Sequence, residues 1–283
     1  MFAAKSRSSS RRFITETGKA MRCLLSFVLL ILTVAHVAAP PAQAQSAPPV
    51  YTSIGDSIAF GLYAPIGRGF VPRYRDHIRT DTGVTVTLYN LAVPGWTSSQ
   101  LLDALRNNSY FRLRISQSSV ITMSIGGNDF LDARQSYRAG TCGGANNQDC
   151  LLQAALRFAA NWNAILGELA TMRSASDTVF RPIDIYNPYV NEDRATDSWA
   201  DDGGLNDFQV FKPYQQAVNN YIATTMDSIG IPFGRVSLVF NGPDGEIDPS
   251  DLGLIAFDGL HPNDEGHRVI ADLLRNLGYA PLG

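Results

Sequence analysis

The sequence predicts an α/β fold in which helices cover both faces of a mostly parallel, five-stranded sheet. One observation is the order of the segments, because short apolar runs alternate with longer amphipathic ones, as in parallel α/β folds. The other is composition: 45% of the 283 residues are hydrophobic and 17% are charged, which excludes a disordered chain, a collagen-like repeat and a multispan membrane protein. No internal repeat or Ser/Gly linker divides residues 50–283, so we expect a single domain there.

Five short apolar runs have the length and the content of β-branched residues that strands require. The first run ends in Gly55, and the third ends at two glycines. The second run reads V-T-V-T-L-Y-N-L-A and shows the alternation of a half-buried strand. The predicted strands are residues 50–54, 84–92, 119–125, 179–186 and 234–240.

Four longer segments have helical spacing of apolar residues. Thr97 or Ser98 is a suitable N-cap for the first helix, and Pro213 suits the first turn of the third. The predicted helices are residues 96–106, 151–172, 208–229 and 263–277. In the second, the expected buried stripe consists of Leu152, Ala155, Leu156, Ala159, Ile165 and Leu169. Two long loops, residues 132–150 and 189–206, are candidates for the rim or lid of a site.

Residues 1–44 have the three parts of a secretory signal peptide, with six basic residues and one acidic residue. The apolar stretch from Cys23 to Ala39 is followed by Ala42-Gln43-Ala44, so we expect cleavage after Ala44, with residues 45–49 as a short tether. An uncleaved anchor is the alternative, but about 17 residues are marginal for spanning a bilayer. Met21 is an alternative start of translation. The mature protein is therefore expected to be secreted or periplasmic, with no stable membrane span.

From Gln45 onward the chain carries 17 basic and 25 acidic residues. A body this acidic is unsuited to binding nucleic acid or an anionic membrane through charge. Nothing indicates a coiled coil or a swapped strand, so we expect a monomer. Cys142 and Cys150 remain after cleavage, and in an oxidising compartment they favour a disulfide. The loop between them is short, so its stabilisation is expected to be about 2–3 kcal/mol at most.

Four short blocks carry residues suited to nucleophilic catalysis, and each also has an ordinary structural explanation. In I-G-D-S, Ser57 is either a nucleophile on a turn or a helix cap. In N-L-A-V-P-G, Gly95 either turns its N–H outward or only forms a turn. In G-G-N-D, Asn128 either aims its amide across the sheet edge or serves the backbone. In D-G-L-H-P, Asp258 either orients His261 as a base or caps the last helix.

Taken together and in this order, the four blocks resemble those of the SGNH hydrolases, also called the GDSL esterase/lipase family, across residues 51–266. Ile58 replaces the leucine that usually follows the serine, whereas G-x-N-D and D-x-x-H-P are matched in full. The resemblance implies a flavodoxin-like, three-layer α/β/α sandwich and neither a metal nor an organic cofactor.

The resemblance also implies a role for each matched residue. Ser57 is expected to be the nucleophile, His261 the general base and then acid, and Asp258 its orienting partner. The expected oxyanion hole consists of the N–H groups of Ser57 and Gly95 with the side chain of Asn128. The stretch R-Y-R-D-H-I-R predicts that His77 lies on a surface helix, and His267 is expected to be structural. Asp56 and Asp129 are expected to hold turns.

The predicted function is therefore a secreted serine hydrolase that cleaves carboxylic esters through an acyl-enzyme, an esterase or lipase. Two alternatives stay open: a polysaccharide O-deacetylase using the same site, and a non-catalytic carbohydrate- or lipid-binding module on the same scaffold. Four aromatic residues suit an acyl groove, a sugar platform or plain packing: Trp96, Trp199, Phe208 and Phe211. The oxygen-rich stretch 241–251 lacks EF-hand spacing and is expected to be a solvated acidic loop, not a calcium site.

Overall fold

The computed structural model describes residues 48–282, which belong to one compact unit. The predicted signal peptide, its cleavage site and most of the tether lie outside the described residues. Four parallel strands form one sheet in the order β2-β1-β3-β4. The strands are β1 (Val50–Gly55), β2 (Thr87–Asn90), β3 (Ser118–Ser124) and β4 (Val179–Pro182).

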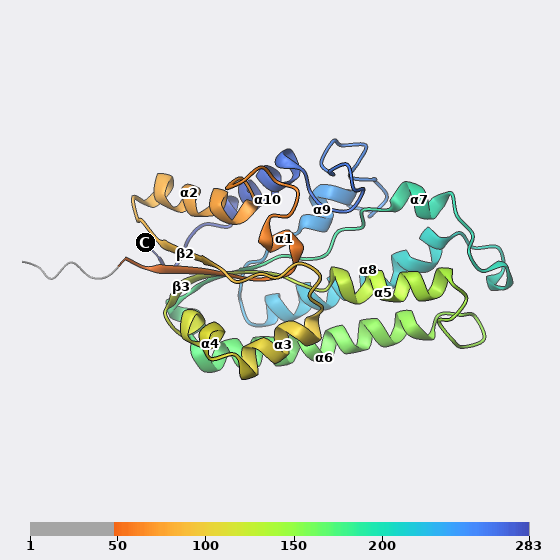
Figure 1. The fold of residues 1–283 in the computed structure, drawn as a ribbon, viewed down its shortest axis with the longest axis horizontal. Helices are drawn as coiled ribbons and strands as arrows, with labels where there is room; N and C mark the ends of the chain where they lie inside the picture. Colours follow the sequence, from red (N-terminus) through yellow and green to blue (C-terminus); the bar gives the residue numbers. More distant parts are fainter. Residues whose placement is uncertain (1–47, 283) are drawn as a thin grey trace, which may run out of the picture. The chain divides into compact units, whose positions relative to one another are not determined.

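Helices cover both faces of this sheet, as Figure 1 shows for the described part of the chain. One face carries α1 (Ser57–Phe60), α2 (Phe70–Thr82), α9 (Val236–Asn241) and α10 (Asp264–Asn276). The other carries α3 (Ser98–Asn107), α4 (Ser109–Ser116), α5 (Gly127–Arg138), α6 (Asp149–Met172) and α8 (Asp207–Ser228). A short helix, α7 (Val190–Arg194), packs against α8. The predicted α/β fold with helices on both faces of a parallel sheet is confirmed. No helix of residues 48–282 is long and apolar enough to cross a bilayer.

The predicted fifth strand, residues 234–240, is wrong. Gly234 makes one parallel bridge to Ile183, and the chain then turns into α9. The carboxylate of Asp184 accepts hydrogen bonds from the N–H and the hydroxyl of Ser237, at 2.8 and 2.6 Å. These bonds satisfy groups at the start of α9, so a cap from a distant residue overrides the strand propensity of V-S-L-V-F.

Pro213 also lies elsewhere than predicted. A capping box of Asn206 and Gln209 begins α8 at Asp207, which places Pro213 in the second turn instead of the first. A proline there removes the bond that its N–H would donate to the carbonyl of Gln209. Packing of Val210, Phe211 and other apolar side chains keeps the helix intact at this point.

Further differences concern the long helices and the loops. In α6 the buried face runs through Leu151, Phe158 and Trp162, whereas the predicted Leu152 and Leu156 are exposed. The wide aromatic side chains decide which face is buried, since they remove more area from water. The first predicted loop is shorter, because α5 continues to Arg138, and α7 interrupts the second loop.

Candidate active site

The strand order brings the predicted blocks to one edge of the sheet. The chain proceeds outward from β1 to β2 and then returns to β3 on the other side of β1, so the carboxyl ends of β1 and β3 meet at the reversal. In open α/β sheets, ligands bind at such a switch point. Ser57 follows β1 and Asn128 follows β3.

Close packing of the backbone fixes the turn that carries Ser57. Gly55 has a φ of +128°, and a Cβ there would lie 1.8 Å from the carbonyl oxygen of Ser124, so only glycine fits. Asp56 then caps α1, accepting hydrogen bonds from the N–H of Ile58 at 3.0 Å and the Ser124 hydroxyl at 2.9 Å. Ser57 is the first residue of α1, so its N–H lacks the carbonyl that a helix interior would supply.

Ser57, His261 and Asp258 form a hydrogen-bonded chain. Ser57 Oγ lies 2.8 Å from His261 Nε2, and His261 Nδ1 is hydrogen-bonded to Asp258 Oδ2. Both Ser57 and His261 are buried. The other carboxylate oxygen of Asp258 accepts the backbone N–H groups of Leu260 at 3.2 Å and His261 at 3.1 Å. Burial raises the pKa of Asp258, but these bonds outweigh it and lower the pKa below its usual value.

Asn128 lies at the start of α5, and Gly95 lies in the loop between β2 and α3. Asn128 Nδ2 donates one hydrogen bond to the carbonyl of Trp96 at 2.8 Å, and an amide has a second N–H. Gly95 has a φ of +84°, and no atom lies within 4 Å of the position that a Cβ would take. The peptide beside Gly95 is therefore open on that side.

Asp56 and Asp129 hold turns, and Asn90 does so as well. Asp129 accepts the N–H and the hydroxyl of Ser98 at 2.8 and 2.6 Å, which ties α5 to the start of α3. Asn90 Nδ2 donates to the carbonyl of Ala59 at 2.8 Å. Burial raises the pKa of Asp56 to about 7 and also raises that of Asp129. Asp56 therefore retains its proton to a much higher pH than an exposed aspartate does.

His267 belongs to the core rather than to this chain of residues. It is fully buried, its Nδ1 accepts the first N–H of α2 from Phe70 at 3.3 Å, and its Nε2 donates to the carbonyl of Leu62 at 3.4 Å. This pattern requires the neutral ring, and burial accordingly lowers the pKa of His267 to about 4. His77 lies on α2 and contacts Asp272 at 2.9 Å.

A change of His267 to asparagine is expected to remove part of the acid sensitivity of folding. The unfolded histidine takes up a proton near pH 6.5, but the folded one does so only near pH 4. As the pH falls between these values, wild type should therefore lose about 1.4 kcal/mol of unfolding free energy per pH unit relative to His267→Asn, about 3 kcal/mol in all. Urea unfolding of both proteins at pH 7.5, 6, 5 and 4.5 measures this difference. A difference that stays constant with pH would contradict it.

A cavity of about 110 Å³ opens beside Ser57, Asn128 and His261. Its walls come from α5, the start of α6, α8 and residues 183–189. Of the four aromatic residues singled out from the sequence, only Phe211 lines this cavity. Trp96 stacks on Phe111, Trp199 packs beside Gly140, and Phe208 is buried below two cationic side chains.

Several wall residues could not be found from the sequence. Leu131 and Leu151 lie in segments without a motif, and tertiary packing alone brings them together. Tyr186 also lines the cavity, and its hydroxyl donates to the carbonyl of Leu260 at 2.6 Å. That bond fixes the loop between Asp258 and His261. Within residues 48–282 no group of three or more His, Cys, Asp or Glu side chains is arranged to hold a metal ion.

Comparison with known proteins agrees with this geometry. Residues 53–269 match the model of the GDSL-like lipase/acylhydrolase family. The spore germination lipase LipC of Bacillus licheniformis is 26% identical over 235 residues, which cover 82% of this chain and 97% of that protein. The lipase Lip_vut3 from a goat rumen metagenome has a similar fold, with a TM-score of 0.67 and 21% identity over 83% of this chain and all of that one. Phospholipase A1 of Streptomyces albidoflavus gives a TM-score of 0.53 and 16% identity over 81% and 99% of the two chains.

Proposed function

Since the chain belongs to the GDSL-like lipase/acylhydrolase family and is an ester hydrolase, we propose that it is an exported serine hydrolase that cleaves carboxylic esters through an acyl-enzyme. One observation carries the proposal: Ser57, His261 and Asp258 form an unbroken hydrogen-bonded chain beside a cavity. A serine hydroxyl is a weak nucleophile until a neighbouring base takes its proton. A chain of this kind provides that base and its orienting carboxylate.

In the proposed mechanism, Ser57 Oγ attacks the ester carbonyl while its proton passes to His261 Nε2. The carboxylate of Asp258 keeps the proton on Nδ1 beforehand and stabilises the imidazolium afterwards. The tetrahedral intermediate collapses, and His261 gives its proton to the departing alcohol. Water then attacks the acyl carbonyl while His261 Nε2 takes its proton. The bond between the acyl group and Ser57 Oγ breaks, the acid leaves, and His261 returns the proton to Ser57 Oγ.

The negative oxygen of the tetrahedral intermediate needs donors that are already in place. The N–H of Ser57 at the start of α1, the N–H of Gly95 and the second N–H of Asn128 supply them in this proposal. The carbonyl of Trp96 holds the Asn128 amide in one orientation, so little reorganisation is required when charge develops.

The acyl-enzyme is tested by rapid mixing with p-nitrophenyl acetate and by a serine-directed p-nitrophenyl phosphonate. We expect a burst of about one p-nitrophenol per protein if deacylation is slow, and a phosphonate adduct on the peptide that contains Ser57 by mass spectrometry. Turnover without an adduct on that peptide would contradict the assignment of the nucleophile.

A change of Asn128 to alanine is expected to lower kcat about 10²–10³-fold with little change in KM. The variant loses one hydrogen-bond donor to the oxyanion of the tetrahedral intermediate. Binding of the ester in the ground state depends much less on that donor. Steady-state kinetics on p-nitrophenyl acetate measure the effect. The matched control is Asn107→Ala, which removes an exposed amide that donates to Asp103 at 2.7 Å, and it should leave kcat unchanged. A loss confined to KM would contradict the oxyanion role.

Export is part of the proposal because two features support it. Residues 1–44 have the pattern of a signal peptide. In addition, Cys142 and Cys150 form a disulfide, a bond that persists mainly in oxidising compartments. N-terminal sequencing of protein recovered outside the cytoplasm should begin at Gln45. An intact leader on the recovered protein would contradict cleavage.

A further inference from the structure

Most polar side chains around the cavity beside Ser57 are already paired with other protein groups. The surface that they leave for a ligand is therefore mainly apolar. Asp184 binds Ser237, and Asp193 is paired with Arg134 at 2.6 Å. Gln215 Nε2 donates to the carbonyl of Ile185 at 2.9 Å. What remains for a ligand is a narrow space bordered by Phe130, Leu131, Leu151 and Phe211.

We call Leu151, Phe211 and Tyr214 the end wall of this cavity, because they line it from the start of α6 and from α8. In Figure 1 the start of α6, where Leu151 lies, is at the far end of α5 and α6 from α1, where Ser57 lies. Leu151 and Phe211 belong to one small buried cluster with Tyr137 and Cys142. The Tyr137 and Phe211 rings meet edge to face at 5.1 Å. The end wall is therefore packed from behind.

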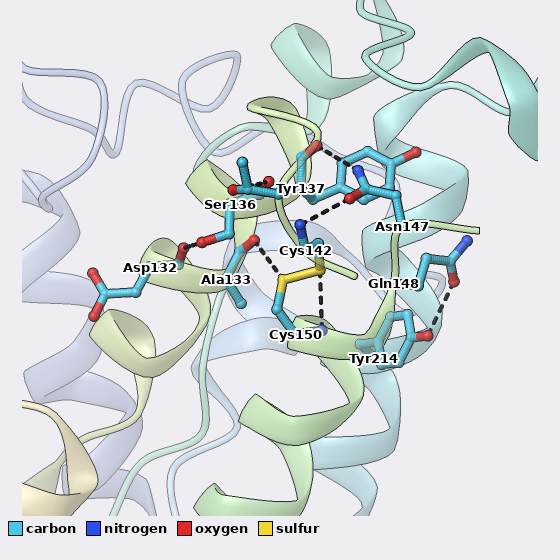
Figure 2. The surroundings of a disulfide bond; sticks show 10 residues. Asp132, Ala133, Ser136, Tyr137, Cys142, Asn147, Gln148, Cys150 and Tyr214 are labelled. Carbon is cyan, nitrogen blue, oxygen red and sulfur yellow. Dashed lines mark hydrogen bonds between the residues drawn. A yellow bond between two sulfur atoms is a disulfide. The ribbon is translucent and has the colours of Figure 1, made fainter. Parts of the chain in front are cut away.

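The disulfide loop, residues 142–150, is hydrogen-bonded to Ala133 and Tyr137 on α5 and to Tyr214 on α8, as Figure 2 shows. Cys150 precedes Leu151 directly and is bonded to Cys142. Asn147 accepts the N–H of Cys142 at 2.8 Å and donates to the carbonyl of Tyr137 on α5 at 2.7 Å. The Tyr214 hydroxyl donates to Gln148 in the same loop at 3.0 Å. The loop thus joins α5, the first turn of α6 and α8.

We propose that the end wall sets the longest acyl chain that the enzyme accepts, and that the disulfide loop holds Leu151 in place. This rests on the proposed function, since the acyl group of the ester must enter the cavity when its carbonyl lies at Ser57. An apolar cavity of about 150 Å³ holds benzene. A space of about 110 Å³ therefore suits acyl groups of about four to six carbons.

The acyl-chain profile of p-nitrophenyl esters tests this proposal. For wild type, kcat/KM should rise about fourfold per methylene up to butanoyl or hexanoyl and fall at least tenfold by palmitoyl. In Leu151→Ala the ratio of kcat/KM for the decanoyl ester to kcat/KM for the hexanoyl ester should rise at least tenfold. Its kcat/KM for the acetyl ester should stay within about threefold of the wild-type value. The matched control is Leu152→Ala, which changes the next residue on the exposed side of α6 and should keep the wild-type profile.

Two further measurements keep the test decisive. Leu151→Val is the second variant, to be measured if Leu151→Ala does not fold. It should move the acyl-chain profile in the same direction by a smaller amount. The variant with both Cys142→Ser and Cys150→Ser lacks the disulfide that holds Leu151 in place. Its ratio of kcat/KM for the decanoyl ester to that for the hexanoyl ester should rise at least threefold. An unchanged profile in either Leu151 variant overturns the proposed role of the end wall, and an unchanged profile in the double serine variant overturns the proposed role of the disulfide loop.

Binding of free acids separates this proposal from the proposed function. Calorimetry with sodium octanoate and sodium laurate on Ser57→Ala requires no turnover. We expect octanoate to bind more tightly than laurate, and Leu151→Ala in the same background to reduce the difference at least fivefold. Absence of ester turnover with this binding pattern intact would reject the proposed function alone. Turnover without the pattern would reject the end wall alone.

Discussion

Replacement of Ser57 by alanine is expected to lower kcat on p-nitrophenyl esters by about 10⁴–10⁶-fold. The change removes the atom that forms the acyl bond, while the donors of the oxyanion hole and the cavity stay in place. A small residual rate should therefore remain, with a KM close to that of wild type. The burst and the phosphonate adduct should both disappear. Steady-state kinetics at enzyme concentrations high enough to detect the residual rate measure the effect.

The fold of the Ser57→Ala protein should be preserved. The variant loses one hydrogen bond, between Ser57 Oγ and His261 Nε2, which is worth about 1 kcal/mol. Ser116→Ala is the matched control, because it removes an exposed hydroxyl that donates to the carbonyl of Leu113 at 2.9 Å. It should retain full activity. If Ser57→Ala kept more than about a hundredth of the wild-type kcat, another nucleophile would be at work.

The four sequence blocks could be found because each is short and local, three of them directly after a strand and the fourth directly before the last helix, α10. Asp258 reaches His261 within one turn, and Asp56 caps the helix that Ser57 begins, so neighbouring residues determine most of their geometry. The strand order then brings the blocks together. In any open parallel sheet, the loops at the carboxyl ends of the strands meet where the strand order reverses. The catalytic roles of these residues stay predictions until the variants are measured.

The wall of the cavity could not be predicted in the same way. Leu151 and Phe211 lie 60 positions apart in the sequence and meet only through the packing of α6 against α8. The helical spacing of Leu152 and Leu156 predicts that they lie on the buried face of α6. In the structure the buried face is instead the one that carries Phe158 and Trp162. The predicted fifth strand is wrong for a similar reason, since Asp184, which binds Ser237 at the start of α9, is distant in the sequence.

A change of Asp258 to asparagine is expected to lower kcat about 10⁴-fold without unfolding the protein. The asparagine carbonyl can still accept the N–H groups of Leu260 and His261, so the loop keeps its shape. Its NH2 group would then face His261 Nδ1, where the carboxylate now accepts a bond. The imidazole must place its proton on Nε2 instead, and Nε2 can no longer take the proton of Ser57.

The matched control for this change is Asp272→Asn, which alters another aspartate in contact with a histidine. Asp272 lies on α10 and contacts His77 on α2. It should leave kcat within about twofold of wild type. Asp258→Asn should also react with the phosphonate far more slowly, because labelling requires the same proton transfer from Ser57. Normal labelling of Asp258→Asn with impaired ester turnover would contradict a tautomer effect and assign the loss to a later step. Equal labelling and equal turnover would mean that His261 needs no carboxylate partner, and that Asp258 serves only to hold the loop.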